Sequence, residues 1–245
     1  MSDSHAVAVA EHGAHEHPAH LRHHFVSLEQ QDETASFGMW LFLLTEIMFF
    51  GGLFTAYLIY RNWYYPAFVS ASHTLSITLG AINTLVLITS SFTMAMGVWC
   101  AETKKQKGLI WSLIATIVLG FAFLGIKTVE YKEKFEKHHV PGSSFSIQSF
   151  VHPVAEDGKA ADKALPADTA ARTEVYFSLY FAMTGMHAVH MIVGIGLLLM
   201  MLVQAIRGAY SHGNIAFVEN FGLYWHFVDL VWIFLFPLLY LISRH

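Results

Sequence analysis

The chain has 245 residues, of which 55% are hydrophobic and 13% are charged, with a formal net charge of -4. Soluble domains carry about 25% charged residues, so the polar surface is too small to cover a globule of this length in water. The small net charge gives no sign of a nucleic-acid partner, and one cysteine, Cys100, cannot form an internal disulfide. Part of the surface is therefore predicted to face lipid.

Residues 1–36 form a polar leader before the first apolar stretch. Seven of the 16 histidines lie in it: His5, His12, His15, His17, His20, His23 and His24. Such a tract could bind a transition metal weakly, although no regular ligand spacing is evident. Its composition otherwise favours a disordered, solvated segment, and both interpretations remain open.

Five later stretches meet the length test for crossing a bilayer, which takes about 20 mostly apolar residues. They cover residues 37–60, 75–100, 109–129, 175–206 and 221–242. A backbone in hydrocarbon must satisfy its own hydrogen bonds, and no alternating pattern of the barrel kind is present. The sequence predicts an all-α bundle of five transmembrane helices over residues 37–245.

The connections between these stretches differ in composition. Residues 131–174 are largely polar and are predicted to form a solvated loop. The third helix is expected to continue into this region, supported by the i,i+4 pairs Glu130–Lys134 and Glu133–Lys137. Three lysines in the turn at 101–108 place that turn, and with it the N-terminus, in the cytoplasm by the positive-inside rule.

Ionisable residues inside the spans need an explanation, because charge at bilayer depth is costly. Glu46 lies near the middle of the first stretch, either as a hydrogen-bonded tie between helices or as a proton-relay or partner-contact group. In the fourth stretch, Thr184, His187, His190 and Gly194 share one helical face. We favour hydrogen bonds between helices for these histidines over haem ligation, which would need another histidine such as His226.

The fifth stretch carries His226 and Asp229 three residues apart, and Trp225 and Trp232 seven residues apart. An interhelical polar cluster is the favoured interpretation of His226 and Asp229, over a chemical role. Arg61 follows the first stretch beside three aromatic residues, a pattern typical of contact with lipid headgroups.

Motifs in all five stretches resemble one protein family. FGMWLFLLTEIMFFGGLF at 37–54, MTGMHAVHMIVG at 183–194 and YWHFVDLVWIFLF at 224–236 are similar to helices of cytochrome c oxidase subunit III. NT at 83–84 and VEY at 129–131 match the two intermediate helices. The resemblance identifies Glu46 with the intramembrane glutamate of that family.

The resemblance implies the five-helix bacterial form, because two further helices precede the glutamate helix in seven-helix members. It implies an accessory subunit of a proton-pumping oxidase that reduces oxygen to water in the bacterial cell membrane. Haem and copper would belong to subunits I and II, with no metal, cofactor or catalytic residue on this chain. The chain would pack mainly on subunit I, bind phospholipid and support proton uptake and turnover stability. The residues expected to serve these contacts are Glu46, Arg61, His187, His190, Glu219, His226 and Asp229.

Three other functions remain open from the sequence. The chain could serve a ubiquinol oxidase or a nitric oxide reductase instead. It could be a membrane cytochrome b, with His187 or His190 opposite His226 on a haem. It could also be a transporter with Glu46 and Asp229 on the ion path, although no inverted repeat is evident.

Overall fold

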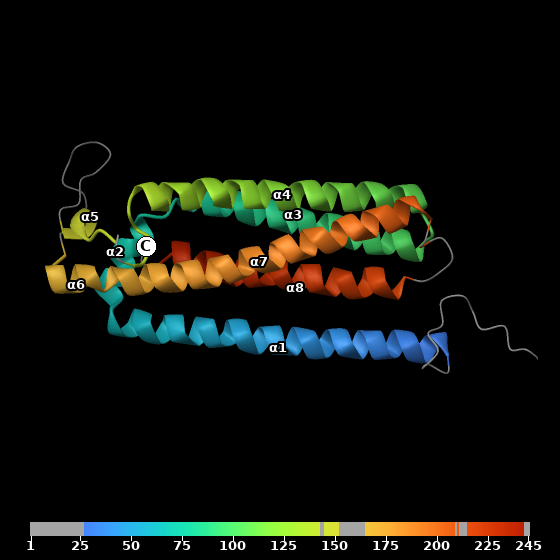
Figure 1. Ribbon diagram of the computed structural model, residues 1–245, viewed down its shortest axis with the longest axis horizontal. Helices are drawn as coiled ribbons and strands as arrows, with labels where there is room; N and C mark the ends of the chain where they lie inside the picture. The colour runs from blue at the N-terminus through green and yellow to red at the C-terminus, as the bar shows by residue number, and fades with distance from the viewer. Residues whose placement is uncertain (1–26, 143–144, 152–164, 209, 211–214, 243–245) are drawn as a thin grey trace, which may run out of the picture.

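The computed structural model describes residues 27–142, 145–151, 165–208, 210 and 215–242. Within these ranges the chain is helical, and five helices are long and apolar enough to cross a membrane. They run back and forth along one common axis (Figure 1). The predicted all-α bundle of five membrane-spanning helices is therefore confirmed. The histidine tract of the leader lies outside the described residues.

The first helix, α1 (Leu28–Trp63), begins earlier than the expected start near Phe37. Ser27 caps it by accepting a hydrogen bond from the backbone N–H of Gln30 at 3.2 Å. Residues 28–36, which were expected to belong to the leader, therefore form its first turns. With 36 residues the helix is about 54 Å long, so it extends well beyond a hydrocarbon core of about 30 Å.

A short helix, α2 (Tyr65–His73), occupies the link after α1 and starts with a proline in its first turn. The second and third spans are α3 (Ile77–Glu102) and α4 (Gln106–Glu136). Lys104 sits in the tight turn between them with a positive φ of 56°. Because α4 runs to Glu136, the expected extension of the third helix past residue 129 is present.

The region expected as a polar loop contains two short helices, α5 (Gln148–Val151) and α6 (Ala167–Ala171). The fourth and fifth spans follow as α7 (Thr173–Ile206) and α8 (Ala216–Tyr240). The expected loop at 131–174 is thus shortened from both sides, by the end of α4 and by α6.

Helix α8 is the most enclosed of the five spans. It packs on α3, α7 and α1, whereas α4 packs on α3 and α7 (Figure 1). In the most apolar 18-residue stretch of α8, 56% of the residues are buried inside the protein. The corresponding stretch of α1 is 17% buried. Helix α8 therefore forms the centre of the bundle, and α1 is its most exposed member.

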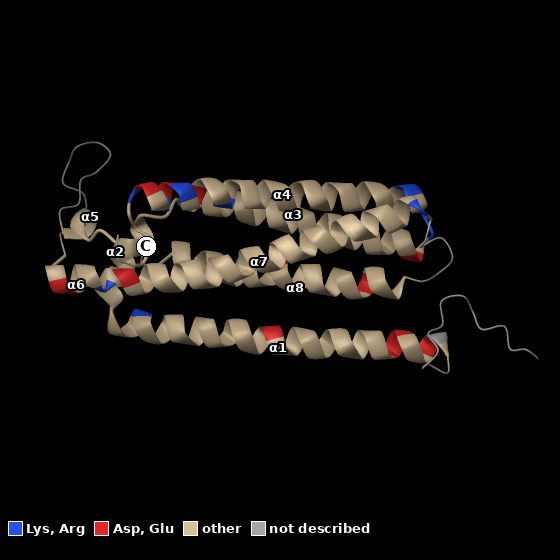
Figure 2. Ribbon diagram, in the orientation of Figure 1, with Lys and Arg blue, Asp and Glu red and all other residues tan. Residues whose placement is uncertain are grey.

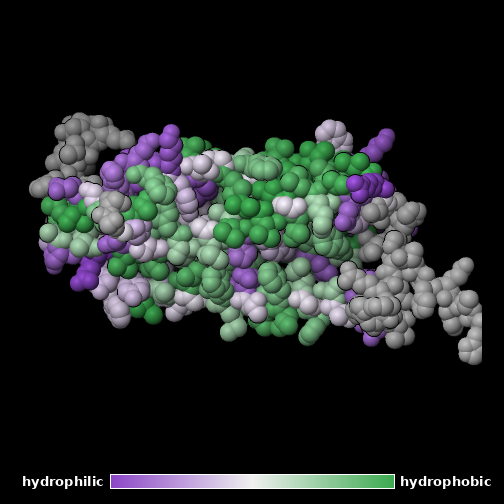
Figure 3. Space-filling view, in the orientation of Figure 1, coloured by the Kyte–Doolittle hydropathy of each residue, from purple (hydrophilic) through white to green (hydrophobic). Residues whose placement is uncertain are grey.

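The surface of the bundle separates charge from apolar side chains. Most Lys, Arg, Asp and Glu lie near the two ends, with an acidic position halfway along α1 as an exception (Figure 2), and hydrophobic residues cover most of the middle (Figure 3). Large apolar side chains point outward on all five spans, among them Trp40, Phe92, Trp111, Ile192 and Leu230. An outer surface of this kind matches a lipid environment.

Small residues let the spans approach α8 closely. The indole of Trp225 is fully buried and donates from Nε1 to Ser90 Oγ on α3 at 3.1 Å. A Cβ placed on Gly194 of α7 would lie 2.8 Å from the Trp225 ring, which is too close for two carbon atoms. The absence of a side chain at Gly194 is therefore what lets α7 meet α8 here.

We expect Gly194→Ala to destabilise the protein by about 1–3 kcal/mol, because the added methyl group must displace a rigid buried ring. Gly196→Ala on the same helix is the matched control, since a Cβ there meets nothing within 4 Å. Thermal unfolding of both variants in detergent measures the difference. Equal midpoints for the two variants would contradict this packing.

At the end of the bundle that holds α5 and α6, His139 follows α4 and is 2% exposed. Its ring lies 5.1 Å from that of Phe177 and 5.2 Å from that of Phe150. Burial, aided by the positive charges of Lys134 and Lys137, lowers the pKa of His139 from 6.5 to about 4. The imidazole is therefore neutral in the folded protein at neutral pH.

Acidification should weaken this end of the protein through His139. Between about pH 6.5 and pH 4 the unfolded chain binds a proton that the folded chain does not, so stability falls as the pH is lowered through this window. His139→Phe should reduce that pH dependence, as measured by thermal unfolding at several pH values. His138→Asn, at the exposed neighbour, should retain it; the same slope in all three proteins would disprove the assignment.

Candidate functional site

Glu46 of α1 meets His190 of α7 in the apolar middle of the bundle. Glu46 Oε2 lies 3.1 Å from His190 Nε2, and both side chains are only partly buried. The ring of Phe50 lies 5.4 Å from the imidazole. The structure thus brings together two of the residues that the sequence singled out separately.

The second nitrogen of His190 fixes the proton arrangement of this pair. His190 Nδ1 lies 2.8 Å from the carbonyl oxygen of Met186, which can only accept a hydrogen bond. Nδ1 must then carry a hydrogen. A hydrogen bond between Nε2 and the Glu46 carboxyl therefore needs one further proton, shared between these two groups. The geometry allows that proton to reside on either the carboxyl or the imidazole, so the pair can hold a proton at mid-helix.

His187 faces a different neighbour, although it lies one turn from His190. Its Nε2 lies 3.1 Å from the carbonyl oxygen of Val228 on α8. The rings of Phe123 and Trp232 each lie 5.3 Å from the imidazole, and the side chain is 1% exposed. His187 is therefore enclosed between α4, α7 and α8.

His226 and Asp229 of α8 line one hollow of about 460 Å³ against α3. His226 Nδ1 lies 2.6 Å from Ser91 Oγ, which joins α8 to α3. Asp229 is 2% exposed and lies beside Ser91 in the same hollow. Ser91 of α3 thus lies against both His226 and Asp229 of α8, as an interhelical polar cluster requires.

The remaining expected residues lie at helix ends. Glu219 is exposed in the first turn of α8 and lines a second hollow of about 360 Å³, beside Ser36 and Trp40 of α1. Arg61 lies in the last turn of α1, next to the ring pair of Tyr60 and Trp63. These two residues do not belong to one site.

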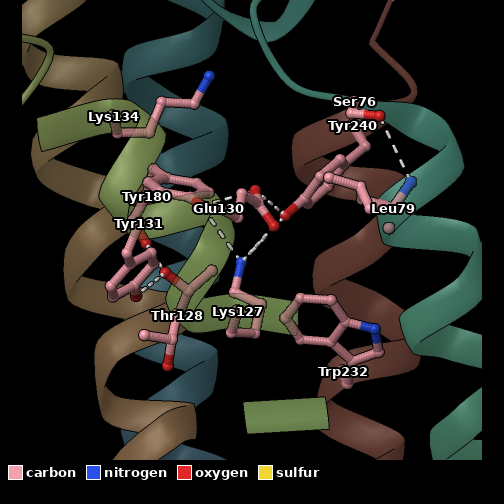
Figure 4. A network of polar contacts seen from close by, with 12 residues as sticks. Ser76, Leu79, Lys127, Thr128, Glu130, Tyr131, Lys134, Tyr180, Trp232 and Tyr240 are labelled. Carbon is pink, nitrogen blue, oxygen red and sulfur yellow. Dashed lines mark hydrogen bonds and ion pairs between the residues drawn. The ribbon is translucent and has the colours of Figure 1, made fainter. Parts of the chain in front are cut away.

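A buried ion pair that the sequence did not reveal connects α4, α7 and α8 (Figure 4). Lys127 Nζ donates to Glu130 Oε2 at 3.0 Å, and the two side chains are 5% and 2% exposed. The hydroxyls of Tyr180 and Tyr240 donate to Glu130 Oε1 at 2.8 and 2.5 Å. Lys127 Nζ also lies 3.2 and 3.1 Å from those two hydroxyls.

This network corrects the expected Glu130–Lys134 pair. Glu130 pairs with Lys127, whereas Lys134 Nζ donates to the carbonyl oxygen of Thr74 at 2.5 Å. The expected Glu133–Lys137 pair is present at 2.7 Å. A lysine within the apolar run LGFAFLGIKTVEY was the available signal for a buried cation, since it lies one turn before the glutamate.

The three histidines of the spans thus bond to three different partners: a carboxyl of α1, a carbonyl of α8 and a hydroxyl of α3. Within the described residues, no group of three or more His, Cys, Asp or Glu is placed to hold a metal ion. Chemically, the arrangement is suited to holding protons and joining helices.

Comparison with known proteins agrees with the helix motifs. Residues 23–155 and 165–244 match the family model of cytochrome c oxidase subunit III. The chain is 29% identical to cytochrome c oxidase subunit 3 of Thermostichus vulcanus, over 99% of this chain and 97% of the relative. It is 31% identical to cytochrome c oxidase subunit 3 of Synechocystis sp., over 94% of this chain and 79% of that relative. A probable quinol oxidase subunit 3 of Staphylococcus haemolyticus is 28% identical to this chain, over 84% of this chain and 88% of that relative.

We expect Lys127→Met to destabilise the protein by about 3–5 kcal/mol, because Glu130 then stays buried without its cation. The double variant Lys127→Met/Glu130→Gln should recover much of that loss. Lys137→Met, which removes an exposed pair, should cost about 0–1 kcal/mol. Thermal unfolding in detergent compares the three, and similar midpoints for Lys127→Met and Lys137→Met would refute a structural role for the buried pair.

Proposed function

Because the chain belongs to the cytochrome c oxidase subunit III family, we propose that it is the accessory subunit of a cytochrome c oxidase and itself carries no haem or copper. The family forms part of the haem-copper oxidases, which are membrane oxidoreductase complexes of aerobic respiration and electron transport. The chain is thus an oxidase subunit, and the assignment of electron donor, oxygen reduction and proton pumping to its complex is part of the proposal.

The observation that carries this proposal is that the intramembrane histidines are already hydrogen bonded to other helices of this chain. His187, His190 and His226 each hydrogen bond to the protein, and they do so toward three different helices. A membrane cytochrome b would need two of them opposed across one haem. Electron transfer is accordingly assigned to subunits I and II, with this chain packing mainly on subunit I.

Phospholipid binding is proposed for a hollow of about 350 Å³ between α1, α7 and α8. Apolar side chains line most of it, including Met39, Phe42, Val193 and Phe221, and His190 lies at its edge. Such a lining fits an acyl chain. Arg61, at the opposite end of α1, is proposed to contact a headgroup in the other leaflet.

Support of proton uptake is proposed for the Glu46–His190 pair. One proton joins the carboxyl to Nε2, and both groups are partly exposed, so the pair can exchange it with a partner or with water. We further propose a location in the bacterial inner membrane with the N-terminus in the cytoplasm. The exposed residues Lys104, in the turn between α3 and α4, and Lys107, in the first turn of α4, lie at the same end as the start of α1 and support that orientation.

A quinol oxidase is the second candidate complex, because the Staphylococcus haemolyticus relative carries that name and matches 84% of this chain. Purification in mild detergent, followed by oxygen consumption with cytochrome c or with quinol, separates the two donors. Haem-bearing subunits should co-purify with the chain in either case. One haem per isolated chain, measured as the pyridine haemochrome, would overturn the accessory role.

We expect Glu46→Ala to leave the haem spectrum of the complex intact but to lower retention of this subunit or activity during sustained turnover. The variant leaves His190 Nε2 without its partner and removes the polar tie between α1 and α7. Glu33→Ala, at an exposed position on the same helix, is the control. Unchanged retention and unchanged sustained turnover for Glu46→Ala would remove Glu46 from the functional residues.

A further inference from the structure

A row of protonatable side chains leads from one end of the bundle to the middle of α8. Glu219, His226 and Asp229 follow one another along the same side of this helix, at steps of seven and three residues. Glu219 is exposed in the first turn, His226 is partly buried, and Asp229 is 2% exposed near mid-helix. Burial of the row therefore increases with depth, from the end of the bundle at which α1 and α8 begin (Figure 1).

A hollow of about 360 Å³ joins the outer two members of this row. Glu219 and His226 both line it, together with the polar side chains of Ser36 on α1 and Asn220 on α8. One water molecule takes up about 30 Å³ in the liquid, so the hollow has room for several. Because Glu219 is exposed at the helix end, water can enter there and reach the imidazole of His226.

Ser91 of α3 joins the inner two members of the row. Its Oγ lies 2.6 Å from His226 Nδ1, and its hydroxyl is also a hydrogen-bonding neighbour of the Asp229 carboxyl. A carboxylate can only accept, so the Ser91 hydroxyl donates to Asp229 and its oxygen accepts from the Nδ1–H of His226. Nε2 is then the nitrogen of His226 that remains for exchange with water.

No cation competes with a proton for Asp229 in this region. As far as the structure describes the chain, the linings of this hollow and of the 460 Å³ hollow around Asp229 contain no lysine or arginine. Their titratable members are Glu219, His226 and Asp229, and α1 and α3 contribute only uncharged side chains. A charge at this depth is costly without a partner. A proton that arrives through the row is what can neutralise the carboxylate.

We propose that Asp229 is a proton-binding site, loaded from the hollow at the start of α8 through His226 and Ser91. A proton from water in the hollow binds His226 Nε2, and the proton on Nδ1 passes to Ser91 Oγ. The hydroxyl proton of Ser91 passes in turn to the Asp229 carboxylate. His226 ends neutral with its hydrogen on Nε2, Ser91 is again a hydroxyl, and Asp229 is a neutral acid. The reverse transfers return the proton to the same hollow.

This site is distinct from the pair of Glu46 and His190, which joins α1 to α7. The path to Asp229 runs between α3 and α8 and uses neither member of that pair. The proposal therefore goes beyond the function proposed above, and it holds or fails on the properties of this chain alone.

Infrared spectroscopy of the full-length chain in detergent tests the site, because the carbonyl band of a neutral carboxyl group shifts in D₂O. Asp229→Asn should remove one such band and so identify it. After rapid mixing with D₂O, Ser91→Ala should slow the shift of this band at least about 100-fold, as expected for the loss of a positioned proton-transfer group. His226→Phe should slow it similarly, whereas Ser91→Thr, which keeps a hydroxyl, should preserve fast exchange.

Ser90→Ala is the matched control, since it also removes one serine hydroxyl from α3. Ser90 Oγ accepts from the indole of Trp225 and lies outside the path, so exchange at Asp229 should keep its original rate. Equal rates in Ser91→Ala and the unsubstituted chain would refute the path, and so would equal slowing by Ser90→Ala and Ser91→Ala. A carbonyl region that Asp229→Asn leaves unchanged at every pH tested would refute the site. None of these results depends on whether haem-bearing subunits co-purify, so the oxidase assignment is tested separately.

Discussion

Hydrocarbon offers no hydrogen-bond partners, so the polar side chains of these spans depend on one another. The last turn of α8 illustrates the constraint, because the carbonyl groups at a helix end have no partners within the helix. The hydroxyl of Tyr57 on α1 donates to the carbonyl of Leu238, and that of Tyr176 on α7 donates to the carbonyl of Leu239, each at 2.8 Å. Hydrogen bonds from two neighbouring helices thus satisfy the free carbonyl groups at the end of α8.

The same constraint explains why α8 occupies the centre. Its two tryptophans, seven residues apart, both reach α3: Trp225 Nε1 donates to Ser90 and Trp232 Nε1 donates to Thr84. Its His226 also bonds to α3, and its backbone accepts from His187 of α7. A helix with this many polar contacts is stable in the bundle only when neighbours surround it.

The number of spans and their class followed from the sequence, because length and apolarity alone decide whether a helix can cross a bilayer. The ends of the helices did not follow, since Ser27 caps α1 in a segment whose composition resembles a solvated leader. The pairing of Lys127 with Glu130 did not follow from the sequence either. Their tyrosine partners lie 53 and 113 residues from Lys127, at distances that local spacing does not reveal. Glu46 and His190 could be singled out, but not paired, for the same reason.

The place of α1 in the bundle bears on how the chain is made. It is translated before the other four spans described, yet it packs mainly on α7 and α8, the last two of the five. Glu46 precedes its imidazole partner by 144 residues. An acidic side chain at the centre of a membrane helix costs about 2.5–3.5 kcal/mol on insertion scales. The nascent α1 must therefore stay in the bilayer with this penalty uncompensated until the ribosome has delivered the other half of the pair.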